Sequence, residues 1–132
     1  ESGKADPEKL PRIYLVNWFR RNRDGGFAWP GFGENIRAVQ WIMDRLDGAV
    51  DAVDEPIGYL PKIDDINLEG IEVSERDMEK LFDVPARAWL IEMDVTSEYF
   101  DELGEKLPEA IRSELARVDA ELKDKLKDNA EV

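Results

Sequence analysis

The stretch FAWPGFGENIR, residues 27–37, places three large aromatic rings within six residues. One proline and two glycines separate these rings, and a charged Glu34 and an amide, Asn35, follow at once. A core strand would supply aliphatic side chains here, and a plain turn would supply polar ones. Because the stretch fits neither pattern, its rings are candidates for a role other than ordinary packing.

The flanks of this stretch predict a hairpin that leads into a helix. Residues 12–19, RIYLVNWF, are rich in β-branched and aromatic side chains and predict a strand buried on both faces in its middle. Asp24-Gly25-Gly26 supplies the positive φ values of a turn, and residues 27–29 predict a short return strand that Pro30 and Gly31 end. From Glu34 the recurrence of Ile36, Val39, Met43 and Leu46 at three- and four-residue spacing predicts a helix up to Gly48, and Trp41 on this helix is expected to be core.

The second half of the chain predicts helices joined by short connections. Residues 49–70 are irregular, with at most an edge strand around 57–60, and Ser74 with Asp77 resembles a capping box for a helix to about Phe82. Pro85 and Pro108 suit the first turns of two longer helices, the first of which Gly104 ends. Their expected buried stripes are Ala88, Ile91, Val95 and Tyr99 in the first, and Ile111, Leu115, Val118, Leu122 and Leu126 in the second. The last helix also carries i, i+4 pairs such as Glu121–Lys125.

The organisation is that of a piece of a larger domain. A β-hairpin or short strands precede three to four helices, and a lone strand pair is marginal by itself. We expect a flexible lead-in over 1–11, the strand, aromatic hairpin, helix and irregular segment over 12–70, and helices of the same domain over 71–132. The chain does not begin with Met, for which a tag remnant, a processed end and a cut within a longer chain are the open interpretations.

Composition excludes several classes of function. The 132 residues contain neither cysteine nor histidine, so a disulfide framework, a zinc site and a histidine-based triad are excluded. The net charge of −13 argues against a nucleic-acid surface, and no apolar run is long enough to span a membrane. The default expectation is a cytoplasmic protein. Loop acids such as Asp64 and Asp65 lack a constraining framework, so we assign neither a metal site nor a catalytic residue in this chain.

The aromatic segment is the only basic region of an acidic chain. Residues 11–37 contain five arginines against Asp24 and Glu34, a local balance of +3, so the rest of the chain carries −16. An anionic small ligand would be drawn to such a region. Two rings across a hairpin could admit a flat base, and a purine stacked there would gain about 1–3 kcal/mol. From the residues, a ligand slot and a packed core both stay open, because clustered aromatics are common in cores.

Selection between purines requires contacts to the base edge, and Gly33-Glu34-Asn35 at a helix start could supply them. The first backbone N–H groups of a helix have no partner within it and can donate to a ligand. Guanine offers a carbonyl oxygen, O6, where adenine offers an amino donor, so adenine would set donors against donors. Gly31 and Gly33 would allow the backbone close to the base. Asn35 is also a plausible helix N-cap, which would occupy its side chain locally.

Two runs of the sequence carry a family resemblance. IYLVNWFRRNRDGGFAWPGFGENIRAVQWI and the later EPIGYLPK closely resemble the C-terminal part of GTP-dependent phosphoenolpyruvate carboxykinase. The similarity is dense from about Ile13 to Leu68 and continues loosely through LFDVPARAW and LPEAI. The F-x-W-P-G-F-G-E-N run is the specific element.

The resemblance implies a large, cytosolic, two-lobed α/β enzyme. Such an enzyme interconverts oxaloacetate and GTP with phosphoenolpyruvate, CO2 and GDP, and uses Mn²⁺ and Mg²⁺. In that family the aromatic hairpin forms the guanine pocket. The resemblance implies that Phe32 and Phe19 flank the base, that Phe27 and Trp18 complete the wall, and that the edge and ribose contacts come from Phe32, Gly33, Glu34 and Asn35.

The sequence departs from the family in two respects. Ile36 stands where the family often has a small polar residue, commonly serine. The glycine loop for phosphates, the metal ligands, the substrate arginines and the lid match nothing in these 132 residues, so we expect the missing N-terminal remainder as a partner and an inactive isolated chain. A stand-alone module that binds a purine nucleotide or a peptide without catalysis, and a helical domain whose aromatics are core, are the alternatives.

Overall fold

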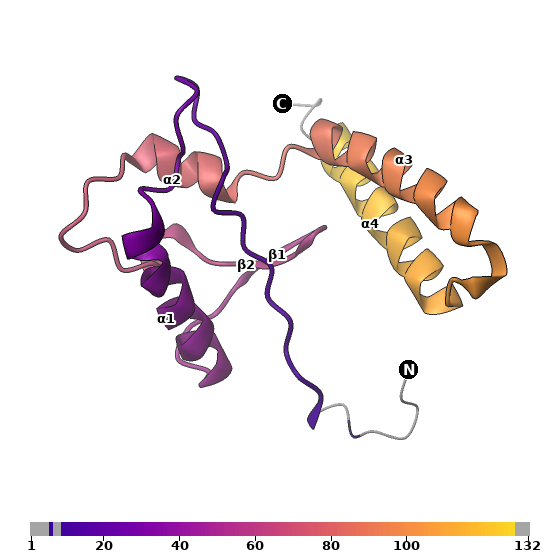
Figure 1. Ribbon diagram of the computed structural model, residues 1–132, viewed down its shortest axis with the longest axis horizontal. Helices are drawn as coiled ribbons and strands as arrows, with labels where there is room; N and C mark the ends of the chain where they lie inside the picture. The colour runs from indigo at the N-terminus through magenta and orange to yellow at the C-terminus, as the bar shows by residue number, and fades with distance from the viewer. Residues whose placement is uncertain (1–5, 7–8, 129–132) are drawn as a thin grey trace. The chain divides into compact units, whose positions relative to one another are not determined.

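The computed structural model describes residue 6 and residues 9–128 (Figure 1). The chain forms two compact units. The first comprises the described residues up to Val50 together with Ile66–Leu81, and the second comprises Asp51–Asp65 together with the described residues from Phe82 onward. The lead-in expected over 1–11 lies largely outside the described residues, and the domain division expected at residue 70 stays a prediction.

The first unit contains two α-helices. A single 3₁₀ turn, Phe32–Glu34, runs directly into α1, Asn35–Leu46, and α2 covers Glu75–Phe82. The Ser74 hydroxyl accepts a hydrogen bond from the Asp77 N–H at 3.1 Å, which confirms that Ser74 caps the helix, and donates to the Asp77 carboxylate at 2.9 Å. The core of this unit is small and consists of the buried residues Ala28, Trp29, Trp41, Ile66 and Met78.

The second unit packs a hairpin and two long helices around one apolar cluster. The strands β1, Val53–Glu55, and β2, Gly58–Leu60, pair antiparallel with Asp54 opposite Tyr59. Helices α3, Ala86–Leu103, and α4, Glu109–Asp128, lie side by side as an antiparallel pair (Figure 1). The cluster is centred on Val84, Ala86 and Leu122, with Ile57, Leu60, Trp89, Leu90, Met93, Val118 and Leu126 packed against it.

Polar contacts fasten the β1–β2 hairpin to α4. The Lys125 ammonium forms an ion pair with the Glu55 carboxylate, and the Arg117 guanidinium donates to the Pro56 carbonyl oxygen at 3.3 Å. The predicted helix pair Glu121–Lys125 is therefore wrong, because Lys125 pairs with the hairpin instead. Glu121 pairs with Arg117, four residues before it, at 2.8 Å.

Helix ends follow the sequence signals more closely than buried faces do. Gly48 and Gly104 lie just beyond the ends of α1 and α3, both with positive φ, and the helices begin near Pro85 and Pro108 as predicted. Trp41 of α1 is buried, as predicted, whereas the predicted buried stripe of α3 is wrong. Exposed positions include Ile36, Val39, Met43 and Leu46 of α1 and Ala88, Ile91, Val95 and Tyr99 of α3.

The strand expected over 12–19 does not form. Residues 12–17 carry no regular secondary structure, and Leu15 is 96% exposed. A strand needs a partner for its backbone N–H and C=O groups, and no described segment pairs with these residues. The β-branched composition of 12–19 is therefore a strand signal without a neighbouring strand.

No helix among the described residues combines the length and the apolar character that a membrane span requires.

Candidate functional site

Residues 18–32, here called the aromatic turn, fold back as a tight hairpin loop. The Ala28 N–H donates to the Arg20 carbonyl oxygen at 2.8 Å, and the Asn22 N–H donates to the Gly26 carbonyl oxygen at 2.9 Å. These bonds enclose a single bridge between Arg21 and Phe27. The backbone reverses at Gly25, whose φ of 84° is costly for a residue with a Cβ. The predicted turn is thus present, although the return strand reduces to one bridge.

The rings of the aromatic turn form two separate pairs. Trp18 and Trp29 lie with ring centroids 6.1 Å apart and tilted by 41°. Phe19 and Phe27 meet edge to face at 5.9 Å. The Arg21 guanidinium carbon lies 4.5 Å from the centre of the Phe27 ring, which is a cation–π distance. Both pairs therefore join residues before the turn to residues after it.

Exposure divides the rings into buried and open ones. Trp29 is 7% exposed and belongs to the core, whereas Phe19 is 71% and Phe32 is 92% exposed. Phe32 makes no ring contact within the described part of the chain. An exposed phenyl ring gains nothing from the core, so packing explains Trp29 but does not explain Phe19 or Phe32.

The 3₁₀ turn that follows the rings uses some of the predicted free amides. The Glu34 N–H donates to the Gly31 carbonyl oxygen at 3.1 Å, and the Asn35 N–H donates to that of Phe32. The N–H of Gly33 has no acceptor among the described residues. Of the three amides expected to be free at the helix start, the structure therefore leaves that of Gly33, because the chain enters α1 through a tighter turn.

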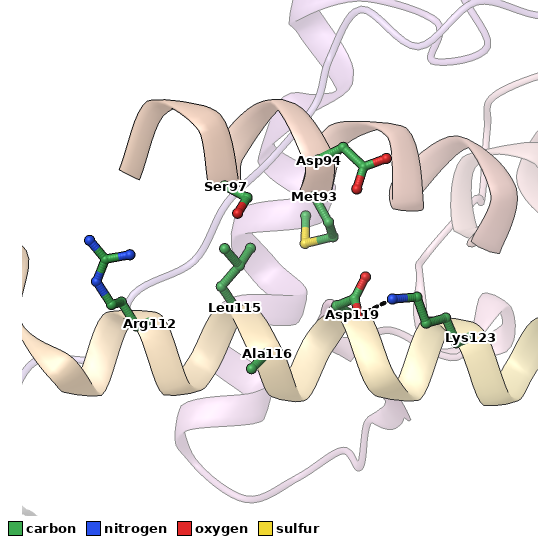
Figure 2. Close-up of a pocket in the computed structure, with 8 residues that line it drawn as sticks. All are labelled: Met93, Asp94, Ser97, Arg112, Leu115, Ala116, Asp119 and Lys123. Carbon is green, nitrogen blue, oxygen red and sulfur yellow. Dashed lines mark hydrogen bonds and ion pairs between the residues drawn. The ribbon is translucent and has the colours of Figure 1, made fainter. Parts of the chain in front are cut away.

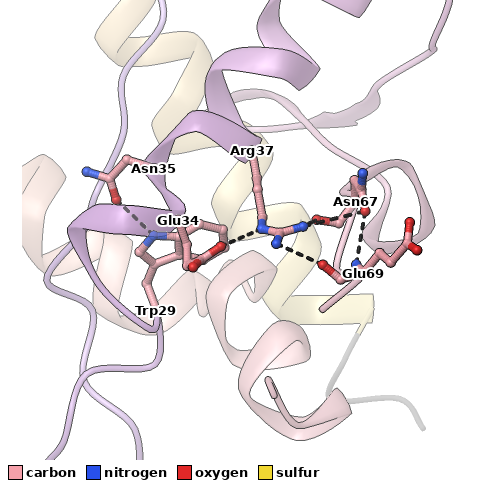
Figure 3. Close-up of polar contacts among 6 residues, drawn as sticks. All are labelled: Trp29, Glu34, Asn35, Arg37, Asn67 and Glu69. Carbon is pink, nitrogen blue, oxygen red and sulfur yellow. Dashed lines mark hydrogen bonds and ion pairs between the residues drawn. The ribbon is translucent and has the colours of Figure 1, made fainter. Parts of the chain in front are cut away.

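The side chain of Asn35 is held by the core. The Trp29 indole N–H donates to Asn35 Oδ1 at 2.9 Å (Figure 3). Asn35 is the first residue of α1, the N-cap position is Glu34, and no side chain caps this helix. The N-cap role considered for Asn35 is thus wrong, because its amide oxygen is taken by the indole.

Arg37 ties the start of α1 to a distant loop. Its guanidinium lies between the Glu34 carboxylate, at 2.7 Å, and the carbonyl oxygens of Asn67 and Glu69, at 2.6 and 2.8 Å (Figure 3). The Arg37 side chain is only 17% exposed. The planar, forked donor set of arginine suits three acceptors in different directions, which a lysine cannot match. The Glu34 carboxylate is therefore held in place as part of this clamp.

The substitution Arg37→Lys is expected to loosen the loop around residues 66–70. Losing two of the three contacts should cost about 1.4 kcal/mol of local stability, which is about a tenfold rise in amide hydrogen exchange. Exchange measured by mass spectrometry on peptides spanning this loop checks the prediction. The matched change Arg87→Lys, at an exposed arginine of α3, should leave the same peptides unchanged, and equal protection in both variants would contradict the clamp.

The arginines of the aromatic segment keep most of their positive charge. Arg20 donates to the Leu81 carbonyl oxygen at 3.1 Å and Arg21 to that of Gly25 at 2.7 Å, and neither contact neutralises a charge. Within residues 11–37, only Arg37 forms an ion pair with a carboxylate among the described residues. The basic balance predicted for this segment therefore remains available to an anion.

A pocket elsewhere lies between α3 and α4 (Figure 2). It is lined by both helices, and two of its lining residues, Asp119 and Lys123 of α4, form an ion pair at 2.5 Å. All its lining residues belong to the second unit, whereas the predicted site residues all belong to the first. Among the described residues, no group of three or more acidic side chains is arranged to hold a metal ion.

The sequence predicts this segment as the candidate site, but three of the contacts that the structure shows there were not predicted. The bond from Trp29 to Asn35 carried no signal in the sequence, because a spacing of six residues across one proline and two glycines fits no regular element. The Glu34–Arg37 pair has the i, i+3 spacing of helical ion pairs and could have been predicted. The link from Arg37 to the loop at 67–69 spans some thirty residues and could not have been predicted from the sequence.

Comparison with known proteins identifies the class. The family described as "Phosphoenolpyruvate carboxykinase C-terminal P-loop domain" matches residues 1–121. The chain therefore belongs to this family, as the resemblance of the aromatic turn implied. The phosphate-binding motif GxxxxGK[ST] does not occur in these 132 residues, so the chain contains only part of what that description covers.

Relatives in three bacterial groups bear the same name, "Phosphoenolpyruvate carboxykinase [GTP]". The protein of Paenarthrobacter aurescens is 48% identical over 114 residues, which cover 86% of this chain and 19% of the relative. The protein of Chlamydia pneumoniae is 46% identical over 118 residues, which cover 89% of this chain and 20% of the relative. The protein of Corynebacterium kroppenstedtii is 40% identical over 126 residues, which cover 96% of this chain and 20% of the relative. The chain spans about a fifth of the length of these relatives.

Proposed function

We propose that this chain is the guanine-binding C-terminal segment of a GTP-dependent phosphoenolpyruvate carboxykinase. The whole protein would convert oxaloacetate and GTP into phosphoenolpyruvate, CO2 and GDP in the cytoplasm. The observation that carries the proposal is the exposure of Phe19 and Phe32, at 71% and 92%, beside a helix start with unused donors. The names of the relatives supply the reaction.

The exposed rings would hold the base by stacking. Phe32 and Phe19 would flank the guanine, with Phe27 and Trp18 as the wall behind it. The edge-to-face contact between Phe19 and Phe27 supports one side of such a slot. Stacking of a base on an aromatic side chain contributes about 1–3 kcal/mol and does not distinguish one base from another.

The donors next to Phe32 would select guanine. The Asn35 oxygen is occupied by Trp29, which leaves the amide NH2 as the group that can meet a ligand. The N–H of Gly33 has no described acceptor. Guanine O6 accepts from such donors, whereas the adenine amino group would face them unpaired, and a mismatch of this kind discriminates strongly. Glu34 would serve through its backbone, because Arg37 holds its carboxylate.

The remaining chemistry would lie outside this chain. Phosphoryl transfer requires a phosphate cradle, metal ions and cationic clamps in line. The described residues do not fit the Mn²⁺ and Mg²⁺ that the family implies, since they offer no cluster of metal ligands. The purified 132-residue chain is therefore expected to show no carboxykinase turnover.

The N-terminal remainder of the enzyme would be the partner of this segment. The apolar stripe of α1 and the side chains of Ile13, Leu15 and Val16 are exposed in the described structure, and exposed apolar surface of this kind is typical of interfaces. A stand-alone module that binds a purine nucleotide or a peptide is the alternative. The fivefold greater length of the relatives favours the enzyme.

A paired fluorescence titration of the natural-length protein tests the proposal. GDP is expected to quench the emission of Trp18 and Trp29 at concentrations where ADP does not, because only guanine satisfies the donors at the helix start. Trp18→Phe should reduce the response to GDP, and Trp89→Phe, in the second unit, should leave it unchanged. A folded protein whose emission responds to neither nucleotide would count against a guanine slot.

A further inference from the structure

We propose that Trp29 is a positioning residue for base selection, because its indole N–H fixes which end of the Asn35 amide faces the nucleotide. This inference rests on the proposed function and deepens it. Trp29 is not among the residues expected to touch the base. Its role would be to act through Asn35.

The geometry leaves one orientation for the amide. The Trp29 ring is 7% exposed and packs against Trp18, so the indole cannot swing out to water. Its Nε1 lies 2.9 Å from Asn35 Oδ1. An indole N–H can only donate, so the amide must present its oxygen to Trp29. Figure 3 shows the amide nitrogen of Asn35 on the side away from the indole.

The fold brings the two residues together by reversing the chain between them. Pro30 ends the return of the hairpin, and Gly31 follows with φ 124° and ψ −173°, a conformation that residues with a Cβ avoid. The 3₁₀ turn Phe32–Glu34 then places Asn35 at the first position of α1. The P-G-F-G spacing therefore serves to return residue 35 to the indole of residue 29.

The orientation of the amide decides which purine is accepted. With its oxygen held by Trp29, Asn35 presents two N–H donors, which suit the guanine carbonyl. Rotated by half a turn, it would present an acceptor, which suits the adenine amino group. That rotation would set the NH2 against the indole N–H and leave a buried donor without an acceptor, which is unfavourable. Trp29 thus opposes the orientation that would admit adenine.

Trp41 provides a matched control. It is a second buried tryptophan of the first unit, 5% exposed, and its ring lies edge to face with Tyr14 at 6.4 Å. Its indole nitrogen has no hydrogen-bond partner among the described residues. Replacing either tryptophan by phenylalanine removes the same atoms from a core, but only Trp29→Phe removes a hydrogen bond to the proposed site.

The test compares Trp29→Phe and Trp41→Phe in the natural-length protein, with the dissociation constants of GDP and ADP as the readout. Trp29→Phe is expected to lower the preference for GDP over ADP about tenfold, by weaker GDP binding together with tighter ADP binding. Trp41→Phe should keep the wild-type preference. If the role of Trp29 were purely structural, Trp29→Phe would weaken the binding of GDP and of ADP by the same factor. An unchanged ratio of the two dissociation constants would therefore overturn the inference.

A measurement on the unaltered protein covers the case in which Trp29→Phe does not fold. In protein labelled with ¹⁵N-tryptophan, the Trp29 indole proton should exchange slowly with D2O, and exchange should slow further with GDP but not with ADP. Rapid exchange that GDP does not change would overturn the positioning role. A wild-type protein without preference for GDP would remove the proposed function and this inference with it, whereas a preference that survives Trp29→Phe removes only the inference.

Discussion

The substitution Asn35→Asp is expected to weaken GDP binding about 100-fold and to abolish the preference for GDP over ADP. A carboxylate at this position would still accept the Trp29 indole N–H, so the local fold should persist. The second carboxylate oxygen would then face guanine O6, an acceptor against an acceptor, with a negative charge added. Loss of the donor and the uncompensated charge together cost about 2.7 kcal/mol, which corresponds to the factor of 100.

The control for Asn35→Asp is the same change at Asn17. Asn17 is exposed, and its side-chain oxygen accepts the Phe19 N–H at 3.0 Å, a bond that aspartate would keep. Asn17→Asp therefore adds the same charge to the same basic segment without removing a donor from the helix start. Equilibrium titration with GDP and ADP measures both variants. Equal losses in the two would assign the effect to net charge and contradict edge recognition by Asn35.

The substitution Phe32→Ala is expected to weaken GDP binding by about 10- to 100-fold without changing the stability of the protein. The stacking of one base on an aromatic ring is worth about 1–3 kcal/mol, which sets this range. Phe32 is 92% exposed, so the folded state loses little when its ring is removed, and the free energy of unfolding should change by less than about 0.5 kcal/mol. The ratio of GDP to ADP affinity should be retained, because stacking does not read the base edge.

Tyr59→Ala is the matched control for Phe32→Ala. Tyr59 is an aromatic residue of β2 in the second unit and is 67% exposed. Both variants remove one exposed ring, and urea unfolding should give wild-type values for both. Phe32→Ala that binds GDP as tightly as Tyr59→Ala would show that the exposed ring does not hold the base.

Local signals in the sequence predicted the helix ends and the turn at Gly25 well. The helix cap at Ser74, the glycines at 48 and 104 and the turn at Gly25 act within a few residues, and the structure has each of them where the pattern indicated. Such signals depend on backbone groups and φ angles close by in the chain. They can therefore be recognised in the sequence without knowledge of the rest of the molecule.

Packing was harder to predict, because it depends on partners far along the chain or outside it. Trp41 of α1 is buried, as predicted, yet the apolar stripe Ile36, Val39, Met43 and Leu46, which has the spacing of a buried face, is exposed in the described structure. In α3 the cluster takes Trp89, Leu90 and Met93 rather than the predicted stripe. The pairing of Lys125 with Glu55 likewise spans seventy residues.

The same difference between local signals and distant contacts holds for the candidate site. Its residues could be proposed from the sequence, because rings, glycines and an amide so close together are unusual and because the run resembles a known family. The contacts that orient them could not be named. The Trp29–Asn35 bond and the Arg37 clamp depend on how the chain reverses at Gly31 and where the loop at 67–69 lies.

The most direct test of the account is the crystal structure of the natural-length protein with GDP. We expect the guanine ring between Phe19 and Phe32, with O6 within hydrogen-bond distance of Asn35 Nδ2 and Asn35 Oδ1 still bonded to the Trp29 indole. A base bound elsewhere, or phenyl rings of Phe19 and Phe32 in contact with each other while GDP occupies the protein, would contradict it.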